Sequence, residues 1–358
     1  MGGKLKTDVL LVIERLAFGG AGVARLSNGK VCFVSGVIPG EKVRVQVRVE
    51  HASYAEADLK EVVEPSPDRV KPRCPVYGRC GGCHYQHLSY PGQLAIKTEQ
   101  LAEVLKRLGG VPNPRVEPIV PSPEQFHYRN RITVHTRSGR VGFFRARSRR
   151  IVEVSHCPIA TERVNALLGE LRSSNPKDGE YPLREPSAFR GFRQVNDAVA
   201  DRLAGIVEEM SRPGGQLFVD AYCGAGFFAK RLTAFFDLTI GIEWSTDAIR
   251  IARQEAGPHE IYLSGDVRRH LVPALDAAPA DSTTLLVDPP EEGVEKDVLE
   301  AIKSRRPSRL IYVSCNPATL ARDVRNLARS YALERVCPVD MFPQTAEIEA
   351  AALLRRVY

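Results

Sequence analysis

The sequence predicts a mixed α/β protein in which a small β-barrel is followed by a doubly wound α/β domain. Residues 6–65 form short runs of alternating apolar and polar side chains, separated by turns such as "FGGAG", "SNG" and "PGE". Such runs predict a small all-β barrel. From about residue 191, apolar strand-like runs alternate with helical patterns. That alternation predicts a parallel sheet with helices on both faces.

The elements between these parts follow in order along the chain. The barrel is OB-like, a fold suited to binding oligonucleotides. "EPSPDRVKPRCP" then predicts a linker, because its prolines interrupt regular structure. A cysteine-bearing loop follows, and "GQLAIKTEQLAEVLKRLGG" predicts a helix from its apolar spacing and final glycines. We therefore predict a barrel at 1–66, a central α+β domain at 67–190 and the doubly wound domain at 191–358.

The composition is that of a folded soluble chain, with 43% apolar and 26% charged residues among 358. No run of apolar residues is long enough to cross a membrane. We expect a cytoplasmic protein without membrane attachment, and we infer no obligate protein partner.

Basic residues are concentrated in one stretch of the sequence. The formal net charge is +7, and the segment 125–151 contains no acidic residue but many arginines, interleaved with histidine and aromatic residues. Guanidinium groups pair with phosphates, and aromatic rings stack on bases. The segment predicts an RNA-binding surface, and a solvated basic hairpin is the alternative.

Four of the eight cysteines have the spacing of a metal site. Cys74, Cys80 and Cys83 form C-x5-C-x2-C on one glycine-rich loop, and Cys157 follows in "SHCPIA". Both zinc and a [4Fe-4S] cluster accept four thiolates. The spacing lacks paired C-x2-C knuckles, which favours the cluster. Cys32, Cys223 and Cys337 are interpreted as packing residues.

The first turn of the doubly wound domain, "GAGFFA", matches a dinucleotide fingerprint and leaves a nicotinamide oxidoreductase as one hypothesis. Asp220 counts against it, because a carboxylate beside a pyrophosphate is repelled. S-adenosylmethionine instead carries positive charge, and Glu243 and Asp266, after the next two strands, could bind its ribose and adenine. Each acid alone could equally be a helix N-cap. Together the three acids favour S-adenosylmethionine.

"DPP" and "SCNP" follow two later strands, so Asp288 and Cys315 should face one crevice. A cysteine near a methyl donor predicts covalent activation of an unreactive carbon, such as C5 of uracil. The reaction also needs a base, and the C-terminal segment offers Asp340, Glu347 and Glu349 as candidates.

Taken together, these motifs resemble the S-adenosylmethionine-dependent RNA 5-methyluridine methyltransferases over essentially the whole chain. The resemblance implies that residues 6–65 form a TRAM domain and that the barrel and central domain bind RNA. It implies uridine C5 methylation of ribosomal RNA, which we prefer as the substrate, or transfer RNA. The site residues that it implies are the [4Fe-4S] ligands Cys74, Cys80, Cys83 and Cys157, the cofactor contacts Gln194, Tyr222, Glu243, Asp266 and Asp288, the nucleophile Cys315 and the general base Glu349.

Three positions differ from the usual family pattern. Glu291 stands where arginine is common, Glu347 where histidine is usual, and Phe227 where a small polar residue is common. The two charge changes alter the field around the target base. They leave open a non-catalytic, redox-sensitive iron–sulfur protein that binds RNA on the same fold.

Overall fold

The computed structural model describes residues 8–146, 148–185 and 194–357, which divide into two compact units. The first unit contains residues 1–100, 124–185 and 342–346, and the second contains 101–123, 186–341 and 347–358. Helix α1 (Tyr90–Arg107) begins in the first unit and ends in the second. Within the described ranges, no helix is both long enough and apolar enough to span a membrane.

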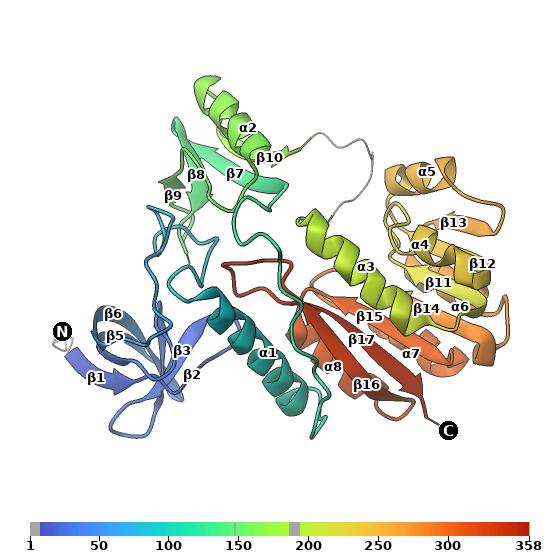
Figure 1. Cartoon of the computed structure of the whole chain (residues 1–358), viewed down its shortest axis with the longest axis horizontal. Coiled ribbons are helices and arrows are strands. Elements are labelled where there is room, and N and C mark those ends of the chain that lie inside the picture. Colours follow the sequence, from blue (N-terminus) through green and yellow to red (C-terminus); the bar gives the residue numbers. More distant parts are fainter. Residues whose placement is uncertain (1–7, 147, 186–193, 358) are drawn as a thin grey trace. The chain divides into compact units, whose positions relative to one another are not determined.

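The first unit starts with a six-stranded barrel sheet in the order β1-β5-β6-β4-β3-β2 (Figure 1). Its core side chains alternate along the strands, as the period-two pattern predicts. The strands are β1 (Asp8–Val12), β2 (Arg15–Leu16), β3 (Ala21–Arg25), β4 (Val31–Ser35), β5 (Lys42–Glu50) and β6 (Tyr54–Glu64).

Apart from Glu64, which ends β6, the predicted linker has no helix or strand, but hydrogen bonds attach it to the barrel. Arg69 donates from Nε and Nη2 to the two carboxylate oxygens of Glu41, at 2.5 and 2.7 Å. Glu41 is fully buried and also accepts the backbone N–H of Ile38 at 2.8 Å. A buried carboxylate is stable only with such partners, so this pair anchors the linker to the barrel.

The rest of the first unit is an antiparallel sheet in the order β10-β7-β8-β9, with one helix packed on it. The basic segment forms its central hairpin, β7–β8. The elements are β7 (Arg131–Arg137), β8 (Arg140–Phe144), β9 (Ile151–Glu153), α2 (Glu162–Ser173) and β10 (Gly179–Arg184).

The second unit is built on a seven-stranded sheet in the order β13-β12-β11-β14-β15-β17-β16, flanked by helices (Figure 1). Its strands are β11 (Gly215–Ala221), β12 (Phe236–Glu243), β13 (Glu260–Ser264), β14 (Thr283–Val287), β15 (Arg309–Ser314), β16 (Tyr331–Val339) and β17 (Glu349–Arg356). Its helices are α3 (Asp197–Ser211), α4 (Ala229–Leu232), α5 (Thr246–Gln254), α6 (Val267–Leu275), α7 (Lys296–Arg305) and α8 (Pro317–Leu327), with 3-10 turns η1 (Thr233–Phe235) and η2 (Ala280–Ser282).

The doubly wound prediction is confirmed, with one correction. Strands β11 to β15 run parallel to one another, and their apolar side chains form the main core. The expectation of a wholly parallel sheet is wrong at β17, which runs antiparallel to both β15 and β16. The short segment 340–348 contains no crossover helix, so β17 can only return beside β16 in the opposite direction.

Candidate active site

The glycine loop after β11 has a backbone that few residues can adopt. Tyr222 has φ of +68° and Gly226 has φ of +86°. A Cβ on Gly226 would lie 2.8 Å from the hydroxyl oxygen of Tyr262, so only glycine fits there. The Tyr222 hydroxyl donates to the carboxylate of Glu295, a residue that the sequence analysis missed. Glu295 precedes α7 without capping it, so its sequence position gave no signal.

Glu243 ends β12 and holds this loop. Its carboxylate accepts the backbone N–H of Gly224 at 3.1 Å and that of Ser245 at 2.8 Å. The side chain that caps α5 is Ser245, so the capping alternative is wrong for Glu243. The carboxylate therefore lies at the carboxyl ends of β11 and β12, where doubly wound sheets bind ligands.

Asp266, in contrast, is a helix cap. Its side chain accepts the backbone N–H of Arg268 at 2.9 Å at the start of α6, and the Arg268 guanidinium pairs with both carboxylate oxygens. The hydrogen bond from Arg268 lowers the pKa of Asp266 to about 2. Its contact with a cofactor stays a prediction beside this structural role.

Asp220 is fully buried at the end of β11. Its Oδ2 accepts the backbone N–H of Ala229 at 3.0 Å, while Oδ1 has no hydrogen-bond partner among the described residues. Burial raises its pKa well above the ordinary value, and the nearby Asp288 and Glu243 add to this rise. A buried carboxylate oxygen without a donor is expensive, and a bound positive group would relieve that cost.

Asp288 follows β14, and its backbone N–H donates to the carbonyl of Ala221 at 3.3 Å. This bond joins the ends of β14 and β11. Burial raises the pKa of Asp288 to about 7. The sheet therefore brings Asp220, Glu243 and Asp288 together, as the strand-end positions predicted.

Gln194 lies shortly before α3 and is half-buried. Asn196 is the N-cap of α3, and its side-chain amide donates to the Ser122 hydroxyl at 3.0 Å. The role of Gln194 at the cofactor stays a prediction.

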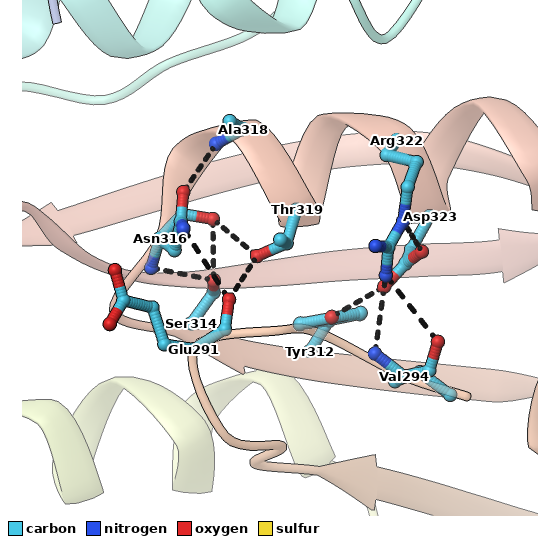
Figure 2. A network of polar contacts seen from close by, with 9 residues as sticks. All are labelled: Glu291, Val294, Tyr312, Ser314, Asn316, Ala318, Thr319, Arg322 and Asp323. Carbon is cyan, nitrogen blue, oxygen red and sulfur yellow. Dashed lines mark hydrogen bonds and ion pairs between the residues drawn. The ribbon is translucent and has the colours of Figure 1, made fainter.

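Cys315 lies in the turn between β15 and α8. Asn316 caps α8 through the backbone N–H of Ala318, and Pro317 is the first helical residue. The Ser314 hydroxyl donates to the carbonyl of Asn316 and accepts its N–H, at 3.0 and 3.1 Å, so two bonds enclose Cys315 (Figure 2). The thiol is half-buried rather than sealed in the core. A nucleophile must be accessible to substrate, and this thiol is more accessible than a cysteine packed in the core.

Negative charge surrounds this thiol. Burial and the nearby carboxylates of Glu349, Asp288 and Glu291 together raise the pKa of Cys315 to about 12. The amino end of α8 does not offset them. Because the thiol is protonated near neutral pH, its ionisation needs an added positive charge or a loss of negative charge.

Glu349 is the buried carboxylate beside the thiol. It starts β17, where Ala350 pairs with Ser314, so Glu349 and Cys315 occupy adjoining ends of neighbouring antiparallel strands. Burial raises the pKa of Glu349 well above its usual range, and Asp288 and Glu347 contribute. Glu347 is exposed, whereas Asp340 is buried after β16. Of the three candidate bases, Glu349 is the one that lies in the strand paired with β15 and acts on the Cys315 thiol, and its role as base stays a prediction.

The four predicted metal ligands all lie in the first unit and are half-buried. Burial and the nearby sulfurs of Cys157, Cys80 and Cys74 together raise the pKa of Cys83 to about 12, so the four cysteines are neighbours. Gln86 accepts the backbone N–H of Cys74 at 3.0 Å, while its buried amide nitrogen has no hydrogen-bond partner among the described residues. Cys32, Cys223 and Cys337 are buried, as packing residues should be.

The cysteine loop also supports the basic hairpin. Cys80 forms a β-bridge with Arg145, and the Gly81 N–H donates to the carbonyl of Phe144 at 3.0 Å. The Phe144 ring stacks on His135 with 3.8 Å between ring centroids. Backbone hydrogen bonds therefore join the β7–β8 hairpin to the cysteine loop.

Comparison with known proteins agrees with this geometry. Residues 8–60 match the model of the TRAM domain, and residues 272–357 match that of tRNA (Uracil-5-)-methyltransferase. An uncharacterized RNA methyltransferase of Gloeobacter violaceus is 31% identical over 97% of this chain and 96% of its own length. One from Bdellovibrio bacteriovorus is 32% identical over 98% and 96%.

The fold has a solved counterpart. The crystal structure of Pyrococcus abyssi tRNA (uracil-54, C5)-methyltransferase in complex with S-adenosyl-L-homocysteine matches with a TM-score of 0.73 and 22% identity, over 97% of this chain and all of that one. At this identity the match shows a shared fold. The curated relatives and the two family models carry the assignment: the chain belongs to the family of S-adenosylmethionine-dependent RNA (uracil-5-)-methyltransferases with an N-terminal TRAM domain.

Proposed function

We propose that this protein methylates C5 of a uridine in RNA through a covalent bond between Cys315 and C6 of the base. The observation that carries the proposal is the position of Cys315 beside the buried Glu349, with Asp288 close to both. A thiol, a base and a crevice of carboxylates at one edge of the sheet are what this chemistry needs.

The residues present fit S-adenosylmethionine. Asp220 has a buried oxygen without a donor, and Glu243 is fixed at the glycine loop, so both favour a ligand that carries positive charge and hydroxyls. Asp288, Asp266, Tyr222 and Gln194 complete the proposed contacts. When bound, S-adenosylmethionine supplies an electrophilic methyl group for C5.

The protein's own residues perform the other steps. The Cys315 thiolate adds to C6, which places electron density on C5 and the adjoining carbonyl. After C5 is methylated, the Glu349 carboxylate removes the C5 proton. The electrons of that C–H bond restore the C5–C6 double bond and expel the thiolate. The target uridine must leave its stack to reach the turn at Cys315.

The first unit holds the features proposed to bind RNA. The TRAM barrel and the β7–β8 hairpin combine an oligonucleotide-binding fold with arginines and a stacked His135–Phe144 pair. Contacts to phosphates supply affinity without sequence information. Ribosomal RNA, preferred on the sequence, and transfer RNA, named by the family model, are both substrates of this chemistry, and mapping of 5-methyluridine in a deletion strain identifies which is used.

A [4Fe-4S] cluster held by Cys74, Cys80, Cys83 and Cys157 is proposed for the first unit. The spacing of these cysteines in the sequence lacks paired C-x2-C knuckles, which favours a cluster over zinc. The buried amide nitrogen of Gln86 is available to donate to one of the thiolates.

Cys315→Ala tests the proposed function. Methyl transfer from labelled S-adenosylmethionine to RNA should disappear, while RNA affinity and cofactor affinity stay within about threefold of the wild type. Cys337→Ala is the matched control, because its thiol is buried in the same unit. Retained methylation in Cys315→Ala would refute the covalent route.

A further inference from the structure

An aspartate is buried on the apolar face of α8, the helix that follows Cys315. We call the turn 314–316, between β15 and α8, the nucleophile turn. Asp323 has no exposed surface, although its helical neighbours Leu320, Val324 and Leu327 are apolar and packed in the core. A buried carboxylate is stable only when its oxygens accept several hydrogen bonds. Apolar packing alone does not explain a carboxylate at this position.

Asp323 accepts hydrogen bonds from three different segments (Figure 2). Its Oδ2 accepts the Tyr312 hydroxyl of β15 at 2.8 Å and the backbone N–H of Val294 at 3.0 Å. Its oxygens also accept Arg322 Nε at 2.8 Å and Nη2 at 3.2 Å. One side chain thus joins β15, the loop after β14 and α8.

These three segments are the ones that border Cys315. The loop after β14 carries Glu291, whose carbonyl accepts the Thr319 hydroxyl at 3.2 Å and the Asn316 amide at 3.4 Å. Figure 2 shows these bonds and those of Asp323 at opposite ends of the first turns of α8. The loop is therefore fixed to the helix on both sides of its glycine.

The loop also lies too close to α8 for a side chain between them. Gly293 has φ of +81°, and a Cβ on it would lie 2.5 Å from Arg322 Nη2 and 2.8 Å from Asp323 Oδ2. This close approach allows Asp323 to reach a backbone N–H. Tight packing of this kind leaves one arrangement of the turn.

We propose that Asp323 is a positioning residue for the nucleophile turn, fixing Cys315 relative to Asp288 and Glu349 without touching substrate or cofactor. The inference rests on the proposed role of Cys315. A displacement of the nucleophile by about 1 Å can lower the reaction rate roughly 100-fold. Loss of the hydrogen bonds of Asp323 could therefore change the rate by up to this amount.

Asp323→Asn tests it, because the side chain keeps its shape but turns one acceptor into a donor among groups that already donate. We expect kcat to fall on the order of 10- to 100-fold while KM for RNA and S-adenosylmethionine stays within about threefold. We also expect alkylation of Cys315 by iodoacetamide to change at least about fivefold, with Cys223 unaffected. Asp237→Asn, exposed on β12, is the control and should match the wild type.

The alkylation measurement needs no RNA, so it separates this inference from the proposed function. If wild-type protein fails to methylate RNA but Asp323→Asn changes Cys315 reactivity, the proposed function is wrong, whereas the positioning role of Asp323 is supported. If Asp323→Asn does not fold, Tyr312→Phe decides, because it removes a single bond to Asp323. A fall in kcat of about three- to tenfold at constant KM supports the inference. Unchanged kcat and unchanged alkylation in the folded variant overturn it.

Discussion

The carbonyl of Glu291 accepts the hydroxyl of Thr319 at 3.2 Å, which fixes an acidic residue beside the nucleophile turn (Figure 2). The Glu291 carboxylate is exposed, yet its charge raises the pKa of Cys315. Members of the resembled family commonly have arginine at this position. Here the backbone contact is present, but the side chain carries a negative charge where arginine would carry a positive one. The difference therefore affects the Cys315 thiol through the electrostatic field of the Glu291 carboxylate.

Neutralising Glu291 should make Cys315 more reactive. In Glu291→Gln we expect the pKa of Cys315 to fall by roughly half a unit to one unit, which increases the thiolate fraction about three- to tenfold. The pH dependence of Cys315 alkylation, followed by mass spectrometry, measures this change. Glu292→Gln, the exposed neighbour, is the control. Equal alkylation rates in both variants would show that the Glu291 charge does not reach the thiol.

Glu349→Gln should trap the covalent intermediate. Glutamine cannot remove the C5 proton, so the Cys315–RNA bond persists after methylation and a denaturation-resistant complex accumulates. Gel electrophoresis with labelled RNA detects it. Glu347→Gln, two residues away and exposed, should turn over RNA without such a complex. Failure to find the adduct with Glu349→Gln would remove that residue from the role of base.

Asp288 should destabilise the protein as pH rises. Its folded pKa is about 7, above the unfolded value near 4, so the folded state keeps a proton that the unfolded state loses between these values. Stability therefore falls from pH 4 to pH 7 and stays low above it. Asp288→Asn removes this cost and should raise the free energy of unfolding by about 1–2 kcal/mol at pH 8.5, discounted from the ~4 kcal/mol of a sealed site because part of the Asp288 surface is exposed.

The measurement is chemical denaturation of both proteins at pH 4.5 and pH 8.5. Near pH 4.5 the two should differ little, because protonated aspartate resembles asparagine. A gain that is equal at both pH values would mean that packing, and not ionisation, is responsible. The same variant should bind S-adenosylmethionine more weakly, since it loses a proposed contact.

Much of the site was predictable because parallel strands end at one edge. Asp220, Glu243, Asp288 and Cys315 each follow an apolar run, and the fold brings these runs side by side. Asp266 shows the limit of that reasoning, because the same strand-end position is also the N-cap of α6. The Asp266 carboxylate accepts hydrogen bonds from the backbone and the guanidinium of Arg268. Sequence position alone does not separate a cap from a ligand contact.

Other features depend on contacts between distant residues. The antiparallel β17 follows from the path of segment 340–348, which hydrophobic periodicity does not reveal. Asp323 did leave a signal, an acid on the apolar face of "TLARDVRNL", but its partners Tyr312 and Val294 come from separate strands and loops. A buried polar residue can be recognised in sequence, whereas its partners require the fold.

Cys157→Ser should remove the cluster. With one of four thiolates missing, we expect iron and sulfide content and absorbance near 400 nm to fall to less than about a third of the wild-type values in anaerobically purified protein. Cys32→Ala, in the buried barrel core of the same unit, should keep all three. Colourless wild-type protein with about one zinc per chain would overturn the cluster in favour of a zinc site.

Glu243→Gln should weaken cofactor binding, and the chain contains its own probe. Trp244 is the single tryptophan, follows Glu243 directly and has 74% of its surface exposed. Binding of S-adenosylmethionine beside Glu243 should therefore change tryptophan fluorescence in the wild type.

Glu243→Gln keeps one acceptor for the Gly224 and Ser245 N–H groups but loses the charge that attracts ribose hydroxyls. We expect Kd to rise about 10- to 100-fold, a loss of roughly 1.4–2.7 kcal/mol. Asp247→Asn, exposed in the first turn of α5, should leave Kd unchanged. If Glu243→Gln also leaves Kd unchanged, the carboxylate braces the glycine loop and does not hold the cofactor.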